Sequence, residues 1–168
     1  MNAKELRQKQ QPLKKQYRQN PESAMHVLHA EGRLHQDRIA VQMRSDRNGR
    51  EVGLHPATGG DGRFACSGDM VLEALAACAG VTLLAVATAM GIRIEHGTVK
   101  AEGDLDFRGT LGVAQDVPVG FKAIRLKFDL DTDADDNQRV NLLRLTERYC
   151  VVHQTLSRSP SLSIAYKE

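Results

Sequence analysis

The pattern of hydrophobic positions predicts one long helix, residues 67–90. Its last 17 residues contain no charged side chain. Ser67-Gly68-Asp69 offers side-chain oxygens for an N-cap at its start, and Gly91 can end it. Because this helix is apolar on nearly every side, we expect other elements to surround it rather than leave it half exposed.

Alternation of polar and apolar residues predicts strands on both sides of this helix. The pattern is clearest in residues 121–131, where Ile124, Leu126 and Phe128 share one parity. A loop rich in glycine and proline is expected at 55–63 and a turn at 45–49. The other expected strands are residues 25–33, 37–44, 50–54, 93–107 and 161–166.

Three further helices are predicted. Residues 3–19 form a polar helical pattern that Asn20-Pro21 ends. Residues 135–149 have acidic side chains at the start and apolar side chains at helical spacing, and 151–157 form a short helical turn. Helices and grouped strands together indicate an α+β fold.

Length and composition indicate one soluble domain. The chain has 168 residues, of which 41% are hydrophobic and 26% charged. We expect a polar N-terminal arm at residues 1–22 and a folded domain at 23–168. Residues 1–20 hold six Lys or Arg and one Glu, so the net charge of +2 hides a basic tail on a mildly acidic body. We interpret that tail as a solvated helix rather than a nucleic-acid contact, and no nucleic-acid partner is expected.

The chain gives no sign of export or membrane insertion. Residues 1–20 lack the apolar segment of a secretory signal. The uncharged run at 74–90 is near the lower length limit for a membrane span and is rich in Ala, Gly and Thr, so a buried soluble helix is expected. Three cysteines, an odd number, favour a reducing compartment. We therefore expect a cytoplasmic protein.

Several common types of site are not expected. The six histidines and three cysteines form no CxxC or HExxH pattern, so neither a metal nor another cofactor is predicted. The Gly59-Gly60-Asp61-Gly62 loop lacks the Lys-Ser/Thr of a P-loop, and a connecting turn is expected there. Ser67 is not in a nucleophile elbow.

Two cysteines carry most of the chemical information. Cys78 lies in the helical stretch EALAACAGVT, and Cys150 follows 72 residues later in ERYCVVHQTL, where a helical pattern ends. Free cysteine is among the most buried residue types, so both could be small core residues. The alternative is a redox device built from two thiols.

The segments around both cysteines resemble the OsmC/Ohr family of thiol-dependent hydroperoxide reductases. The matching segments are GLHPATGGDG at 53–62, CSGDMVLEALAACAGVTL at 66–83 and ERYCVVHQTL at 147–156. The order of strands, long helix, strands and second helix also fits, over roughly residues 25–168. The resemblance implies antiparallel sheets wrapped around a long central helix, in an intertwined homodimer with the active site at the subunit boundary.

The resemblance also implies a peroxidatic role for Cys78 and a resolving role for Cys150. A thiolate attacks a peroxide oxygen, an alcohol leaves, and sulfenic acid remains on the sulfur. The second thiol condenses with it to a disulfide, which an external thiol reduces. Cys78 lies about ten residues into its helix, too far from the N-terminus for the helix dipole to lower its pKa much, so we expect an arginine to stabilise its thiolate.

The supporting arginine and carboxylate are less well defined. In relatives the arginine comes from an early strand or turn, and Arg33 is the best match, with Arg38 second. Relatives of the Ohr type have a Glu ten positions before the reactive cysteine, where this chain has glycine. Asp69, nine positions before, fits another branch and could equally be a helix cap, and Glu73 is the other candidate. Cys66 matches no family cysteine and is interpreted as structural.

The leading functional hypothesis is a peroxidase for organic, including fatty-acid, hydroperoxides, because the residues around Cys78 are apolar. Its expected partners are the hydroperoxide, a lipoyl-type or low-molecular-weight thiol reductant, and a second copy of the chain. The alternative is a non-catalytic small-molecule-binding or redox-sensing module that uses the same apolar cleft.

Overall fold

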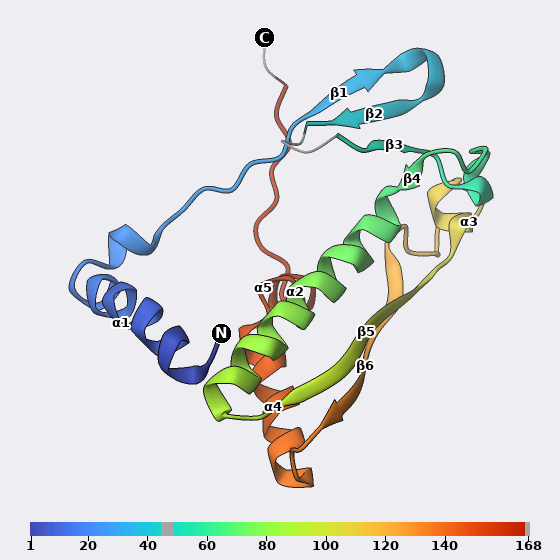
Figure 1. Ribbon diagram of the computed structural model, residues 1–168. Coiled ribbons are helices and arrows are strands. Elements are labelled where there is room, and N and C mark those ends of the chain that lie inside the picture. The colour runs from blue at the N-terminus through green and yellow to red at the C-terminus, as the bar shows by residue number, and fades with distance from the viewer. Residues whose placement is uncertain (45–48, 167–168) are drawn as a thin grey trace. The chain divides into compact units, whose positions relative to one another are not determined.

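The computed structural model describes residues 1–44 and 49–166, so most of the turn predicted at 45–49 lies outside the described residues. The chain divides into two compact units. Figure 1 labels the helices and strands. Unit 1 comprises Met1–Arg7, Ala74–Val99 and Phe128–Glu168, and unit 2 comprises Gln8–Glu73 and Lys100–Lys127.

The α-helices confirm the four that the sequence predicts and add a short one. The confirmed helices are α1 (Ala3–Gln19), α2 (Ser67–Met90), α4 (Asp136–Tyr149) and α5 (Val151–Ser157). The added helix is α3 (Phe107–Thr110), whose N-cap Asp106 accepts the backbone N–H of Arg108. The sequence pattern placed Phe107 at the end of a strand, because one helical turn is too short to show a period.

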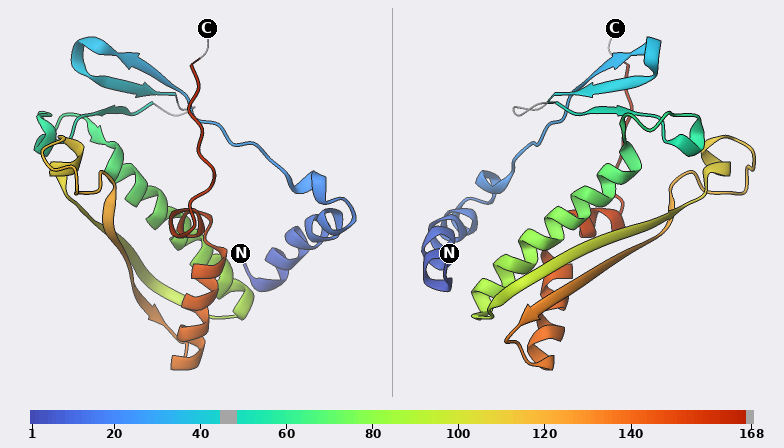
Figure 2. Two further views of the ribbon diagram at one scale, coloured as in Figure 1. Left: turned by 180° about the vertical axis from the view of Figure 1, so that it is seen from behind. Right: turned by 45° about the vertical axis from the view of Figure 1, so that its right-hand side comes forward.

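The strands form two sheets. One has the order β1-β2-β3-β4 and lies in unit 2. Its first three strands are antiparallel and its last pair is parallel. The other sheet pairs the two longest strands, which form the extended ribbon seen in both views of Figure 2. The strand bounds are β1 (Gly32–His35), β2 (Ala40–Met43), β3 (Glu51–Gly53), β4 (Ala65–Cys66), β5 (Ile94–Leu105) and β6 (Phe121–Thr132).

Two predicted strands are corrected. The strand expected at 25–33 begins only at Gly32, and the one expected at 161–166 is not a strand. Leu28 is 90% exposed, and Leu162 and Ile164 are 87% and 102% exposed. A strand needs a neighbour to pair with, and within the described chain residues 25–30 and 161–166 are paired with no strand. Alternating polar and apolar residues indicate a strand-like pattern of side chains, but they do not show whether a neighbouring strand is present.

The ribbon of β5 and β6 has one charged and one apolar face. On β6, Ile124, Leu126 and Phe128 are half-buried, as predicted, and the residues between them are exposed. Across the exposed face Lys127 pairs with Glu102 at 3.1 Å. On the apolar face a Cβ at Gly103 would lie 2.5 Å from the Phe121 ring, so only glycine allows this approach.

The core of unit 1 forms around the second half of α2. Leu75, Ala79, Leu83 and Ala87, spaced four residues apart, are its buried stripe. The core cluster is completed by Ile92, Ala134 and the fully buried Leu142 of α4.

The rest of α2 is less covered than the sequence suggests. Val81 is 70% exposed and Leu84 is 55% exposed, so a single chain buries one stripe and does not surround the helix. By length and composition α2 could cross a bilayer, but it supplies the core stripe of unit 1.

Candidate active site

The two cysteines singled out in the sequence meet in unit 1. Cys78 lies on α2 and is half-buried, and Cys150 is fully buried. Cys150 is both the C-cap of α4 and the N-cap of α5. Its N–H donates to the Thr146 carbonyl at 2.9 Å, and its own carbonyl accepts the N–H of Gln154 at 2.9 Å. Backbone bonds to two helices therefore fix the position of this thiol.

The environment of Cys78 favours its thiolate. Burial raises the pKa of this thiol, but four groups together hold it below the ordinary value of 9.0. They are, in order of effect, the backbone N–H of Val152, the Cys150 thiol, the backbone N–H of Val151 and the Thr82 hydroxyl. Hydrogen bonds to the charged form of a group favour that form, and here they outweigh desolvation. Cys78 is thus the better nucleophile of the pair.

Cys150 is shifted in the opposite direction. Burial raises the pKa of its thiol, the backbone N–H of His153 lowers it, and the neighbouring Cys78 raises it further, so the net shift is upward. Two adjacent thiols cannot easily both ionise, because their negative charges repel each other. The opposite pKa shifts favour the thiolate form at Cys78. The environment therefore makes Cys78 suited to attack and Cys150 suited to remain protonated.

The backbone N–H groups of α5 are functional groups that the sequence reasoning missed. We expected an arginine at Cys78 because its own helix N-terminus is too far away, whereas two amides in the first turn of α5 stabilise its charge. The signal was present in the sequence, since Val151 was predicted to begin a helix and the first N–H groups of any helix lack partners within it.

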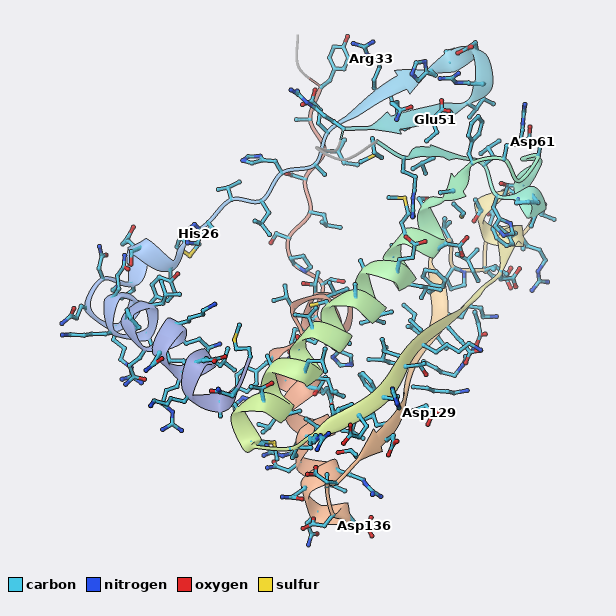
Figure 3. The ribbon with its side chains drawn as sticks, in the orientation of Figure 1. His26, Arg33, Glu51, Asp61, Asp129 and Asp136 are labelled. Atoms are coloured by element: carbon cyan, nitrogen blue, oxygen red, sulfur yellow. The ribbon has the colours of Figure 1, made fainter. Side chains whose placement is uncertain are left out.

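The two candidate arginines lie in unit 2. Arg33 is on β1, where it pairs in register with Gln42 and is exposed; Figure 3 shows its side chain. Arg38 follows β1 and forms an ion pair with Glu51 at 2.5 Å. Arg38 is thus engaged with a carboxylate of its own sheet. The role of Arg33 stays a prediction.

The two candidate carboxylates lie in the first two turns of α2. Because α2 begins at Ser67, Asp69 falls in the first turn, where the helix dipole favours a negative charge. Glu73 forms an ion pair with Arg50, a partner that the sequence analysis did not consider. Of the two carboxylates, Asp69 is the one that lines a pocket.

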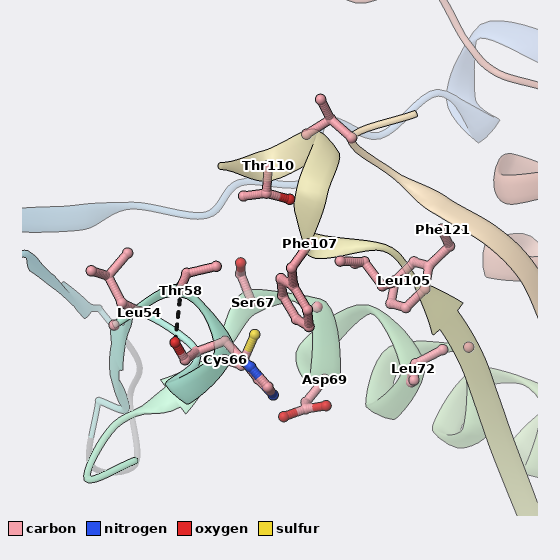
Figure 4. A pocket seen from close by; sticks show the side chains of 15 residues that line it. Leu54, Thr58, Cys66, Ser67, Asp69, Leu72, Leu105, Phe107, Thr110 and Phe121 are labelled. Carbon is pink, nitrogen blue, oxygen red and sulfur yellow. Dashed lines mark hydrogen bonds between the residues drawn. The ribbon is translucent and has the colours of Figure 1, made fainter. Parts of the chain in front are cut away.

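That pocket lies within unit 2 and has a volume of about 440 Å³ (Figure 4). Cys66 of β4 and Asp69 lie on its wall, together with apolar side chains such as Leu72 and Leu105. The ring of His55 stacks on Phe107 with centroids 4.7 Å apart. The lining of the pocket is mostly apolar with a few polar groups, which is typical of small-molecule sites. Cys66, interpreted as structural from the sequence, is thus a half-buried pocket residue.

Within residues 1–44 and 49–166, no group of three or more His, Cys, Asp or Glu side chains could hold a metal ion.

Comparison with known proteins places this chain in a family. Similar solved structures include an OsmC-like protein from Mycoplasma pneumoniae, with 19% identity and a TM-score of 0.66 over 80% of this chain and 89% of that one. An organic hydroperoxide resistance protein OsmC from Legionella pneumophila has 18% identity and a TM-score of 0.61 over 79% and 90%. The organic hydroperoxide resistance protein OhrB of Bacillus subtilis has 17% identity and a TM-score of 0.55 over 80% and 93%.

These likenesses confirm the predicted fold, a mixed α+β structure with antiparallel sheets and a central helix. No curated protein sequence matches the chain. A family model described as OsmC-like protein matches residues 60–165, which is more than half of the chain and includes both cysteines. The chain therefore belongs to the OsmC-like protein family.

Proposed function

We propose that this protein is a cysteine-based peroxidase that reduces organic hydroperoxides. The observation that carries the proposal is the pairing of a thiol whose pKa is lowered, Cys78, with a buried thiol whose pKa is raised, Cys150. This is the division that an attacking and a resolving cysteine require. Two of the three similar structures described above are named organic hydroperoxide resistance proteins, which supports the same proposal.

The reaction uses only the two thiols and external reactants. The Cys78 thiolate attacks one peroxide oxygen, the O–O bond breaks, and the alkoxide leaves as an alcohol after taking a proton. The sulfenic acid on Cys78 then condenses with the Cys150 thiol, which forms an S–S bond and releases water. An external dithiol or two monothiols reduce the disulfide and regenerate both cysteines. No cofactor is needed, and the reductant we propose is a lipoyl-type or low-molecular-weight thiol.

The apolar surroundings of Cys78 favour an organic, including fatty-acid, hydroperoxide over hydrogen peroxide. Its neighbours on α2 include the buried Leu75 and Ala79, and hydrogen peroxide would gain nothing from contact with them. We propose that Arg33, with Arg38 as the second candidate, and Asp69 support the Cys78 thiolate as in relatives.

We also propose that the protein is a cytoplasmic homodimer. Val81 and Leu84 are apolar side chains left exposed on the central helix, and a second copy of the chain could cover them. The arginine at Cys78 would then come from the partner, so that mixing R33A and C78S protomers should restore part of the activity that each variant lacks.

A thiol count tests the proposed function. The reduced protein is treated with one equivalent of cumene hydroperoxide, its free thiols are titrated, and the disulfide is located by peptide mapping. Loss of two thiols with a Cys78–Cys150 bridge supports the peroxidase. A full thiol count after treatment contradicts it and favours a non-catalytic binding module, for which the pocket of unit 2 is the candidate site. A bridge between Cys66 and Cys78 contradicts the role of Cys150.

Steady-state peroxide consumption then identifies the reductant. Dihydrolipoamide, glutathione and thioredoxin are compared side by side at equal thiol concentration. A protein that forms its disulfide but turns over with none of them fits a redox sensor better than an enzyme.

A further inference from the structure

His153 is a titratable group that the cycle above does not use. It is the third residue of α5 and is half-buried. Its Nδ1 atom is enclosed and has no hydrogen-bond partner among the described residues. The Nδ1 of His55, by contrast, accepts the N–H of Ala57 at 3.0 Å. Burying a polar atom without a partner destabilises a fold, so such atoms are rare and often belong to functional sites.

The resolving step of the proposed cycle needs a proton acceptor and a proton donor. The Cys150 thiol is fully buried and enters the step with its proton, which must leave as its sulfur attacks. The hydroxide displaced from the Cys78 sulfenic acid must gain a proton to leave as water. One neutral imidazole can do both, because it accepts a proton on one atom and returns it later.

We propose that His153 is this proton-transfer residue. The inference rests on the proposed function and deepens it. The first turn of α5 influences both thiols: the backbone N–H groups of Val151 and Val152 lower the pKa of Cys78, and the backbone N–H of His153 lowers that of Cys150. Side chains on a helix lean toward its N-terminus, and for His153 that direction leads to the N-cap residue, Cys150.

The step balances without another reagent. Nδ1 takes the proton of the Cys150 thiol as the Cys150 sulfur attacks the Cys78 sulfur. The S–S bond forms, the S–O bond of the sulfenic acid breaks, and the imidazolium gives its proton to the departing hydroxide. The imidazole is neutral again and one water has been released.

Other ionisable groups near α5 fit this role less well. The last turn of α4, which packs on α5, carries Glu147, Arg148 and Tyr149, and all three are exposed. The Arg148 guanidinium lies over the Tyr149 ring, 5.4 Å from its centroid. From α2 the group that faces this turn is Cys78 itself. Among the described histidines, His153 is the one with a buried ring nitrogen that lacks a partner.

The test separates the two chemical steps in a single turnover. Reduced wild type and H153N are mixed with one equivalent of tert-butyl hydroperoxide; dimedone traps sulfenic acid and mass spectrometry follows disulfide formation. Asparagine keeps a hydrogen-bonding atom near the place of Nδ1 but does not carry a proton at neutral pH. H96N, which alters an exposed histidine on β5, is the matched control.

We expect H153N to form sulfenic acid at the wild-type rate and to close the disulfide about 100-fold more slowly, in the range of general acid–base effects. Added imidazole should restore part of the closing rate of H153N and should leave that of H96N unchanged, because free imidazole can take the proton that asparagine cannot. Closure by H153N within twofold of wild type across the pH range would overturn the inference alone. A wild type that forms no sulfenic acid overturns the proposed function and this inference with it. If H153N does not fold, H153Q is measured in its place, and closure within twofold of wild type is again the contradicting result.

Discussion

The first turn of α5 and the thiol of Cys78 belong to different helices, yet the backbone N–H of Val152 lowers the pKa of that thiol. Burial raises the pKa of Cys78, and this N–H is the first of the groups that bring it below its ordinary value. Within unit 1, neutral backbone and side-chain groups therefore offset the cost of desolvating the thiolate.

Val151→Pro should raise the pKa of Cys78 while leaving α5 intact. Proline at the first helical position removes only an N–H that the helix does not use, and the extended backbone of Cys150 (ψ 109°) suits a residue before proline. The Val151 side chain is 69% exposed, so its loss should matter little. The measurement is the pH dependence of iodoacetamide alkylation at Cys78. V151A keeps the N–H and should titrate like wild type; an equal shift in both variants would contradict the amide's role.

Cys78→Ser should abolish peroxide reduction, whereas Cys150→Ser should allow about one turnover and leave a sulfenic acid on Cys78 that dimedone traps. The reason is that only the attacking thiol is needed for the first step. Rapid-quench peroxide assays measure both variants, with C66S as the control that should stay active. Undiminished turnover by C78S would rule out the enzymatic proposal.

Asp106 should stabilise the folded state at neutral pH, and this stabilisation should be lost in acid. Hydrogen bonds from the Arg108 side chain lower the pKa of Asp106 from 3.8 to about 2. Because the pKa is lower in the folded state, this stabilisation is full above pH 3.8 and is lost as the pH falls toward 2. D106N should therefore lose less thermal stability than wild type between those pH values. D116N, in the exposed loop before β6, should behave like wild type, and an unchanged acid profile in D106N would refute the assignment.

Leu142→Ala should destabilise the fold by about 3 kcal/mol, because Leu142 is fully buried in the core of unit 1 and its removal leaves a cavity. The neighbouring Leu143 is 44% exposed, and L143A should cost about 1 kcal/mol or less. Urea unfolding of both variants gives the comparison. Similar losses in the two would show that α4 packs differently.

Val81→Asp should weaken the proposed homodimer. A charge in the centre of the apolar surface of α2 would have to be desolvated on association. Sedimentation velocity at micromolar concentration should show a shift from dimer to monomer in V81D. V113D places the same charge at another exposed valine, 72% exposed, and should not change the mass. A wild type that is monomeric and fully active would exclude the dimer.

Features that depend on residues close together in the sequence could be predicted, and features that depend on distant residues could not. The helix at 67–90 and the strand β6 were predicted correctly because their patterns are local. The strand expected at 161–166 was not found, since pairing depends on a partner elsewhere. The same limit applies to the site. Cys78 and Cys150 could be proposed from their flanking residues and a helix was predicted at Val151, but the effect of its amides on Cys78 required the fold.

Cys150 ends one helix and begins the next, and this position has a thermal consequence in the proposed cycle. A bond from Cys150 to Cys78 would join two points 72 residues apart in the sequence, which restricts the unfolded chain by about 4 kcal/mol. The oxidised protein should then resist heat better than the reduced one. The melting temperature of the protein would therefore report whether it has reacted with a peroxide since a thiol last reduced it.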